Sequence, residues 1–338
     1  MKTDFVCPKC RGALVGDLGA KRCASGHTYD RARAGYYNLL LGSGGDHGDN
    51  KTMVESRRAF LADGYYSPLA DRISALVTAF ALEAANRANA TGHDIESSAQ
   101  PLTAAHFTPD TAATASTPDG SDIPTDREER EVHLPTTPTD KEGGEAYVPT
   151  VLDCGCGEGY YTSRICSALD GALGTEGYSM LAFDISRDAA RLAAKACKSA
   201  SVAVASCYSI PVADGVIDVA MNVFSPLAPR EIHRALTDGG LYIVAYPGED
   251  HLFDLKAAIY DNPYKNQPES NAPDGFTLRS RERIFYEIDL DSNEKIKALF
   301  SMTPYAYRTG KKERDRLDCL AKLHTRVEFF IDVYEKQS

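Results

Sequence analysis

The chain has 338 residues, a length typical of about two domains. Hydrophobic residues make up 43% and charged residues 25%, which is ordinary for a globular protein with a sizeable core. No stretch approaches the roughly 18 consecutive apolar residues of a membrane span, and the first residues, MKTDFVCPKC, lack the apolar segment of a signal peptide. We therefore expect a cytoplasmic protein with no membrane partner.

The formal net charge of −11 argues against a nucleic-acid partner, which a basic surface normally binds. The charge is unevenly distributed, however. Residues 1–72 carry a net charge of +3, whereas residues 84–146 carry −8. Because most of the acidity lies in one segment, the total charge does not exclude RNA.

Residues 1–30 have little apolar periodicity and cannot bury a core of their own. They contain Cys7-x2-Cys10 and, after a gap of twelve residues, Cys23-x3-His27. Three thiolates and an imidazole without a carboxylate are the ligand set of a closed, structural zinc site. A redox Cys-x-x-Cys motif is the alternative, but it would follow a strand in a thioredoxin-like unit, which this segment lacks.

Basic side chains surround the four candidate zinc ligands, and tyrosines alternate with them. Cations bind phosphates and aromatic rings stack on unpaired bases, so this composition fits an RNA-binding face as well as an ordinary solvated surface. The candidate RNA-binding residues are Lys9, Arg11, Lys21, Arg22, Arg31 and Arg33.

Two helices are predicted next, over residues 51–82. Apolar residues recur there at helical spacing, with Pro68 in the first turn of the second helix and its end near Leu82. Residues 84–146 are rich in Ala, Thr, Ser, Pro and Asp, a composition that cannot offset the entropy of ordering. We expect this segment to be an acidic, disordered linker.

From residue 147 onward, short apolar runs alternate with helical patterns, which is typical of a parallel, doubly wound sheet. The predicted strands cover residues 148–153, 180–185, 202–206, 216–224 and 241–246, and the predicted helices cover 159–169, 187–198, 229–236 and 251–260. The last segment differs. Strands over 284–290 and 327–334, separated by a helix near 293–300, would close the sheet with an antiparallel edge.

The first of these strands leads into three alternate glycines, in the sequence VLDCGCGEG. Their spacing differs from the G-x-G-x-x-G dinucleotide motif, and Glu158 would repel phosphates. The loop therefore suits a ligand with an ammonium group and no phosphate, such as S-adenosylmethionine. Asp184 ends the next strand, where a carboxylate can accept both ribose hydroxyls. The alternative is a glycine turn needed only for packing, with Asp184 as a helix cap.

The fourth strand ends in Asn-Val-Phe-Ser-Pro at residues 222–226, at the sheet edge where ligands bind. This resembles the Asn/Asp-Pro-Pro-aromatic motif of amino-group methyltransferases without matching it. Phe224 and Pro226 are therefore weak catalytic candidates, and ordinary packing at a strand end is the alternative. No residue is identified as a general base.

Together these motifs resemble bacterial 23S ribosomal RNA (guanine-N1)-methyltransferases of the RlmA type. The matching stretches are FVCPKCRGAL, CASGHTYDRARAGYYNLL, GDNKTMVESRRAFLADGYYSPL, VLDCGCGEGYYT, LAFDIS and YPGEDHLFDLK. The resemblance covers nearly the whole chain outside residues 84–146. It implies a class I, Rossmann-like S-adenosylmethionine-dependent methyltransferase fold with an N-terminal zinc-ribbon module. It also implies methylation of N1 of a guanine in a 23S rRNA hairpin, and a homodimer; one branch of the family confers macrolide resistance.

The resemblance assigns site residues as well. It implies zinc ligation by Cys7, Cys10, Cys23 and His27, and cofactor contacts from Tyr66, Tyr161, Thr162 and His251 that rest on the resemblance alone. Asp153, Gly155, Gly157 and Asp184 are cofactor-binding candidates on both the residue pattern and the resemblance.

Four segments follow from these expectations. They are a zinc-binding RNA-recognition module (1–45), a helical connector contributing to the cofactor site (46–83), the acidic linker (84–146) and a methyltransferase domain (147–338). Two other functions remain open. A small-molecule methyltransferase would use the same glycine loop, and a non-catalytic, zinc-dependent RNA-binding protein would have lost the activity.

Overall fold

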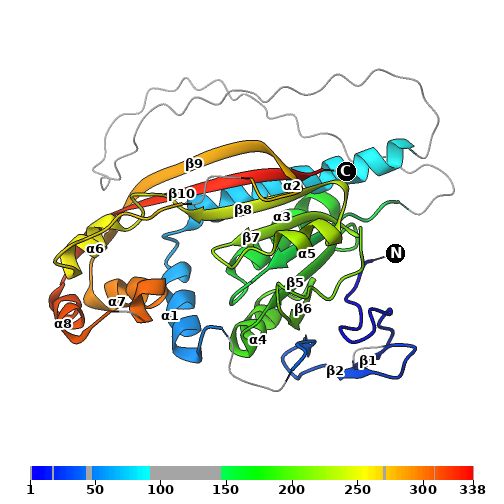
Figure 1. The fold of residues 1–338 in the computed structure, drawn as a ribbon, viewed down its shortest axis with the longest axis horizontal. Coiled ribbons are helices and arrows are strands. Elements are labelled where there is room, and N and C mark those ends of the chain that lie inside the picture. The colour runs from blue at the N-terminus through cyan, green and yellow to red at the C-terminus, as the bar shows by residue number, and fades with distance from the viewer. Residues whose placement is uncertain are drawn as a thin grey trace, which may run out of the picture.

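An eight-stranded mixed sheet forms the centre of the computed structural model, which describes residues 2–16, 19–42, 48–91, 146–268, 272–307 and 309–337 (Figure 1). The strand order is β3-β6-β5-β4-β7-β8-β10-β9. The strands are β3 (Tyr36–Asn38), β4 (Thr150–Cys154), β5 (Ser179–Asp184), β6 (Ala200–Val204), β7 (Ile217–Val223), β8 (Leu236–Pro247), β9 (Phe276–Leu290) and β10 (Leu323–Lys336). β3 to β8 pair in parallel, and β10 pairs antiparallel with both β8 and β9. The predicted parallel sheet with an antiparallel edge is confirmed.

Helices cover both faces of this sheet. They are α1 (Lys51–Ala62), α2 (Ser67–Thr91), α3 (Tyr160–Leu173), α4 (Arg187–Ala196), α5 (Pro229–Ala235), α6 (Phe253–Ile259), α7 (Asn293–Ser301) and α8 (Lys311–Cys319), with a short 3-10 helix at Pro304–Tyr307. Alternate strand residues face opposite layers: Val151 packs with α2 and α3, whereas Leu152 packs with α5 and the N-terminal segment. None of the described helices is long and apolar enough to cross a membrane.

The sequence predicted most of these elements to within a few residues, and β9 shows where it did not. β9 begins at Phe276, eight residues before the predicted start at 284. Its first half alternates exposed polar side chains because β9 is an edge strand. An edge strand buries few apolar side chains, so its sequence shows little of the apolar pattern from which strands are predicted.

The helix α2 corrects the predicted linker boundary. α2 continues to Thr91, so the prediction of a linker starting at residue 84 is wrong for residues 84–91. Ala84 and Ala85 are buried, and the Asn89 side chain accepts a hydrogen bond from the Tyr147 backbone N–H. Alanine favours helix, and burial against the sheet supplies the rest of the stabilisation. The remainder of the predicted linker, residues 92–145, lies outside the described residues.

The N-terminal segment is joined to the sheet more closely than the sequence indicated. A small hairpin of β1 (Ala20–Arg22) and β2 (Thr28–Asp30) precedes β3, and β3 pairs with β6 as an edge of the main sheet. Phe5 and Leu14 pack in one buried cluster with Leu152 and Phe183. The segment that carries the candidate zinc ligands therefore shares its apolar core with the main sheet.

Candidate metal and cofactor sites

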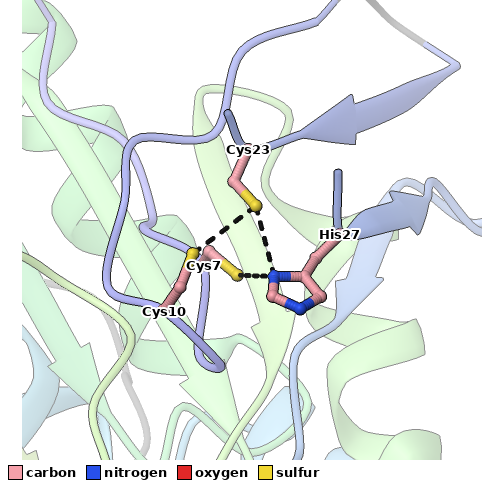
Figure 2. A group of neighbouring side chains, drawn as sticks. All are labelled: Cys7, Cys10, Cys23 and His27. Atoms are coloured by element: carbon pink, nitrogen blue, oxygen red, sulfur yellow. Dashed lines mark hydrogen bonds between the residues drawn. The ribbon is translucent and has the colours of Figure 1, made fainter. Parts of the chain in front are cut away.

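Cys7, Cys10, Cys23 and His27 come together as the sequence predicted (Figure 2). Their ligand atoms all lie within 4.8 Å of one another. His27 Nδ1 lies 3.5 Å from Cys7 Sγ and 3.3 Å from Cys23 Sγ, and Cys10 Sγ lies 3.5 Å from Cys23 Sγ. These separations match the edges of a tetrahedron with zinc–ligand bonds of about 2.0–2.3 Å, so the four residues fit a closed structural zinc site.

Hydrogen bonds to Cys10 favour the thiolate form that a metal needs. A backbone hydrogen bond from Gly12, followed by side-chain hydrogen bonds from His27 and Ser25, lowers the pKa of Cys10 to about 6. The hydroxyl of Tyr29 lies 3.3 Å from Cys7 Sγ. The surroundings of Cys10 therefore favour its thiolate, whereas burial raises the pKa of Cys23.

The six candidate RNA-binding cations divide into two groups. Arg11 donates to the backbone oxygens of Ile210 (2.8 Å) and Val212 (2.6 Å), and so fastens the zinc segment to the sheet domain. Lys21 is buried, pairs with Asp4, and has its pKa lowered to about 8, chiefly by desolvation. Lys9, Arg22, Arg31 and Arg33 are exposed, as Arg11 also is in part, and Arg22 and Arg31 each use Nε in a hydrogen bond within the N-terminal segment.

The glycine loop lies at the carboxyl ends of β4 and β5, where the sequence placed it. The N–H groups of Gly155 and Cys156 both donate to Phe183 O at 2.9 Å. Gly155, Gly157 and Gly159 have φ values of 81°, 55° and 88°, which residues with a side chain rarely adopt. A Cβ at Gly155 would lie 2.5 Å from the Ser225 side chain, and one at Gly159 would lie 2.8 Å from Ala193 Cα. Packing alone therefore accounts for two of the three glycines.

Two carboxylates flank this loop. Asp184 accepts hydrogen bonds from the backbone N–H of Gly157 (2.9 Å) and of Ser186 (2.7 Å), and burial raises its pKa. Each oxygen retains a lone pair with which a ribose hydroxyl could bond. Asp153 is buried and accepts from Thr162 Oγ1 at 2.6 Å. Burial raises the pKa of Asp153 to about 7, so its charge changes near neutral pH.

Glu158 does not act alone, as the sequence argument assumed. Its Oε2 accepts from Arg57 Nε at 2.6 Å, and Arg57 also pairs with Asp49. The carboxylate that was expected to repel phosphates is therefore compensated by a cation from α1. Sequence reasoning missed Arg57 because 101 residues separate the partners. The sequence does contain a signal for a buried partner, because Arg57 lies on the otherwise apolar face of its helix.

Aromatic side chains lie together beside the loop. The ring centroid of Phe224 lies 6.4 Å from that of Tyr66, 6.5 Å from that of Tyr161 and 5.3 Å from that of Phe329. Tyr66 is buried, and its hydroxyl lies 3.4 Å from His251 Nε2. Three residues named by resemblance alone, Tyr66, Tyr161 and His251, thus share one cluster with Phe224.

His251 is a neutral donor in this cluster. Burial lowers its pKa to about 3, with a smaller effect of the Lys256 charge. Its Nδ1 accepts the backbone N–H of Glu328 at 3.3 Å, so the ring proton lies on Nε2 and points at Tyr66 Oη. The Tyr66 hydroxyl hydrogen therefore remains available to another acceptor. Within the described part of the chain, the buried Tyr161 hydroxyl has no hydrogen-bond partner.

The turn after β7 holds Phe224 in an unusual conformation. Phe224 has φ 57° and is 43% exposed, although it is large and apolar. Asn222 fixes the turn by accepting from Ser225 N (3.3 Å) and donating to Pro226 O (3.1 Å), and Ser225 Oγ donates to Cys154 O (2.7 Å). A positive φ costs about 1–3 kcal/mol for such a residue and persists where surrounding contacts impose it. Strain and exposure together favour a binding role for Phe224 over simple packing.

A mixed sheet whose parallel strands carry this loop and these carboxylates is the fold of a class I S-adenosylmethionine-dependent methyltransferase, here with an N-terminal zinc ribbon. Residues 5–41 match the family model "RlmA, N-terminal", and residues 151–240 match the model "Methyltransferase domain". The chain belongs to the family of 23S rRNA (guanine-N1)-methyltransferases of the RlmA type.

Three relatives carry this assignment. The chain is 28% identical to the 23S rRNA (guanine(748)-N(1))-methyltransferase of Streptomyces fradiae, over 92% of this chain and 88% of the relative. It is 30% identical to a "Putative 23S rRNA (guanine-N(1)-)-methyltransferase" of Micromonospora griseorubida, over 74% and 67%. It is 32% identical to a protein of the same description from Bacillus subtilis, over 54% and 64%. The predicted family, enzyme class and cofactors, S-adenosylmethionine and zinc, are confirmed, and the individual site residues stay predictions.

Proposed function

We propose that this chain methylates N1 of a guanine in a hairpin of 23S rRNA, with S-adenosylmethionine as methyl donor. The observation that carries the proposal is the strained, exposed Phe224 beside the glycine loop of a sheet that also packs against a zinc ribbon. A small-molecule site has no evident use for that ribbon. The family membership supports the same reaction.

The cofactor residues have distinct parts in this proposal. S-adenosylmethionine supplies an electrophilic methyl group on a positively charged sulfur. The glycine loop lets it approach the backbone, Asp184 accepts its ribose hydroxyls, and Asp153 adds negative charge opposite its cationic groups. Tyr66 and Tyr161 have hydroxyl hydrogens free to donate on the Phe224 side of the loop.

The target base is held by the turn after β7. N1 lies on the Watson–Crick edge of guanine, so the base must be unpaired or flipped out to reach the site. Phe224 stacks on it, and the backbone carbonyls of residues 224–226 orient its edge. His251 does not take the N1 proton, because both of its ring nitrogens are engaged and its pKa of about 3 is far too low; in this proposal the proton goes to water.

The hairpin is held by the zinc ribbon. Lys9, Arg22, Arg31 and Arg33 are exposed there and can meet phosphates, Arg22 and Arg31 through the guanidinium nitrogens other than the bonded Nε. Arg11 and Lys21 instead bind the sheet domain and Asp4. The family resemblance also implies a homodimer, which we include in the proposal. Light scattering of the purified protein tests the oligomeric state.

The decisive experiment maps methylated guanines in rRNA by mass spectrometry. We compare a deletion strain with the same strain complemented by wild type, Asp153→Ala or Phe224→Ala. Wild type should restore one N1-methylguanine in a hairpin of 23S rRNA, and neither variant should restore it fully. Unchanged methylation in the deletion strain would overturn the proposal. Methylation of small molecules but not of a purified rRNA hairpin would favour the small-molecule alternative.

A further inference from the structure

Arg57 reaches from α1 to the cofactor loop and is fixed there by two carboxylates. Its Nε donates to Glu158 Oε2 at 2.6 Å, and its Nη1 pairs with Asp49. These bonds join residues from two distant parts of the chain. They hold the guanidinium plane against the loop, so that the protein fixes the orientation of its N–H groups.

The third nitrogen of this guanidinium faces the loop backbone. A Cβ on Gly157 would lie 3.0 Å from Arg57 Nη2 and 3.5 Å from its Cζ. Within the described residues, no hydrogen bond engages Nη2. The Arg57 side chain is 21% exposed, so it is not fully enclosed by the protein. Gly157 also donates its N–H to Asp184, the predicted ribose acceptor, so Nη2 borders the site itself.

The helix that carries Arg57 is positioned for this contact. Ser186, the N-cap of α4, donates its hydroxyl to Asp49 O at 2.7 Å, just before α1 begins. Val54 of α1 is fully buried against Ala189 and Leu192 of α4. α1 lies between α4 and α7 (Figure 1), so the guanidinium is held on a packed element and not on a loop.

Without Arg57, the described charged residues around the loop include no cation that could bind a ligand carboxylate. S-adenosylmethionine carries a sulfonium, an ammonium and a carboxylate. Asp153, Asp184 and Glu158 can meet the two cationic groups but would repel the carboxylate. Arg57 is a cation in direct contact with the loop, and among the described residues no hydrogen bond is found at its Nη2.

We infer that Arg57 binds the carboxylate of S-adenosylmethionine through Nη2, and that Glu158 and Asp49 orient it for this contact. The inference rests on the proposed function, because it takes that cofactor as the ligand. It makes α1, which precedes the methyltransferase domain, a part of the cofactor site. In this inference Glu158 also has a positioning role, because its hydrogen bond orients Arg57, which binds the carboxylate of the cofactor.

The test compares two ligands by calorimetry: S-adenosylmethionine and its decarboxylated analogue, which lacks only the carboxylate. Wild type should bind the cofactor about 10- to 100-fold more tightly than the analogue, as for a charged hydrogen-bonded pair. Arg57→Gln should weaken cofactor binding by about that factor and analogue binding by less than about twofold. The neighbouring exposed Arg58 supplies the control, and Arg58→Gln should keep the wild-type ratio.

Each other outcome is informative. Equal losses for both ligands in Arg57→Gln would mean a purely structural role and overturn the inference. Equal affinities in wild type would overturn it as well, with the methyltransferase proposal intact. No binding of either ligand by wild type would instead overturn the proposed function. If Arg57→Gln does not fold, Arg57→Lys is tested in its place, because lysine keeps the charge but lacks the planar nitrogen that corresponds to Nη2. An unchanged ratio of the affinities for the cofactor and the analogue would then reject the inference.

Discussion

Two glycines near the cofactor loop have different roles. Gly155 has φ 81°, and its missing side chain makes room for Ser225, which bonds to Cys154 O. Gly171 lies within α3, and a Cβ there would meet nothing within 4 Å. The first glycine is therefore required by both backbone and space, whereas the second is tolerated at the cost of helix stability.

Substitution by alanine should separate these roles. We expect Gly155→Ala to destabilise the fold by about 1–3 kcal/mol, because it combines backbone strain with overpacking, and to weaken cofactor binding. Gly171→Ala should stabilise the fold by about 0.5–1 kcal/mol, as in a helix interior. Urea unfolding measures the free energy of unfolding of both variants. A Gly155→Ala protein as stable as wild type would contradict the requirement for glycine at this turn.

Asp153 should make cofactor affinity depend on pH. Its pKa of about 7 reflects burial, so its ionised fraction rises as the pH rises through that value. A cationic ligand prefers the ionised form, and affinity should therefore increase from pH 6 to pH 8. Thr162→Val removes the hydrogen bond that lowers this pKa and should move the midpoint upward. Calorimetry across this range measures the effect, and Asp153→Asn should abolish it.

The same carboxyl affects stability in a defined direction. A carboxyl whose folded pKa is raised is stabilising below its unfolded pKa, and that contribution is lost as the pH rises through the folded value of about 7. Asp153→Asn should therefore gain stability relative to wild type between pH 4 and pH 8. A stability difference that does not change with pH would show that Asp153 is not buried as described.

At the scale of elements, local signals and packing contributed unequally. α4 shows a strong local signal: Ser186 accepts Ala189 N at its start, and Ala189 and Ala193 bury one face. α2 extends beyond its predicted end because packing continues, and β9 begins early because pairing with β10 compensates for its polar composition. Elements whose stability comes from partners distant in sequence were the ones predicted poorly.

The N-cap of α4 allows a matched test. Ser186→Ala removes both the cap and the hydrogen bond to Asp49 O, and should cost about 1–2 kcal/mol. Ser163 lies inside α3, where its hydroxyl donates back to Gly159 O, so Ser163→Ala should change stability by less than about 0.5 kcal/mol. Chemical denaturation measures the two, and equal effects would contradict the role given to the cap.

At the scale of the whole molecule, the zinc ribbon and the sheet form one structure. β3 extends the sheet, Arg11 bonds to the loop at residues 210–212, and Phe5 shares the core of β4 and β5. An RNA held by the ribbon is therefore held in a defined place relative to the glycine loop. Loss of the metal should therefore lower the stability of the sheet domain as well as that of the ribbon.

Two exposed cysteines test this coupling. Cys10 belongs to the metal cluster, whereas Cys319 does not. Cys10→Ser should lower the zinc content and the midpoint of the thermal transition, because structural zinc contributes its binding energy to folding. Cys319→Ser should leave both unchanged. Metal analysis and scanning calorimetry measure the outcome, and a zinc-free Cys10→Ser protein that melts like wild type would disprove the coupling.

The sequence by itself determined features that depend on short spacings: the cluster of four candidate zinc ligands, the glycine loop after β4, Asp184 at the end of β5 and the alternation of strands and helices. Neighbours along the chain can be placed by local geometry alone. Only the tertiary structure decided the pairing of β3 with β6, the cluster of Tyr66, His251 and Phe224, and the contact of Arg57 with Glu158. These join segments far apart in sequence, and their geometry depends on how the whole core packs.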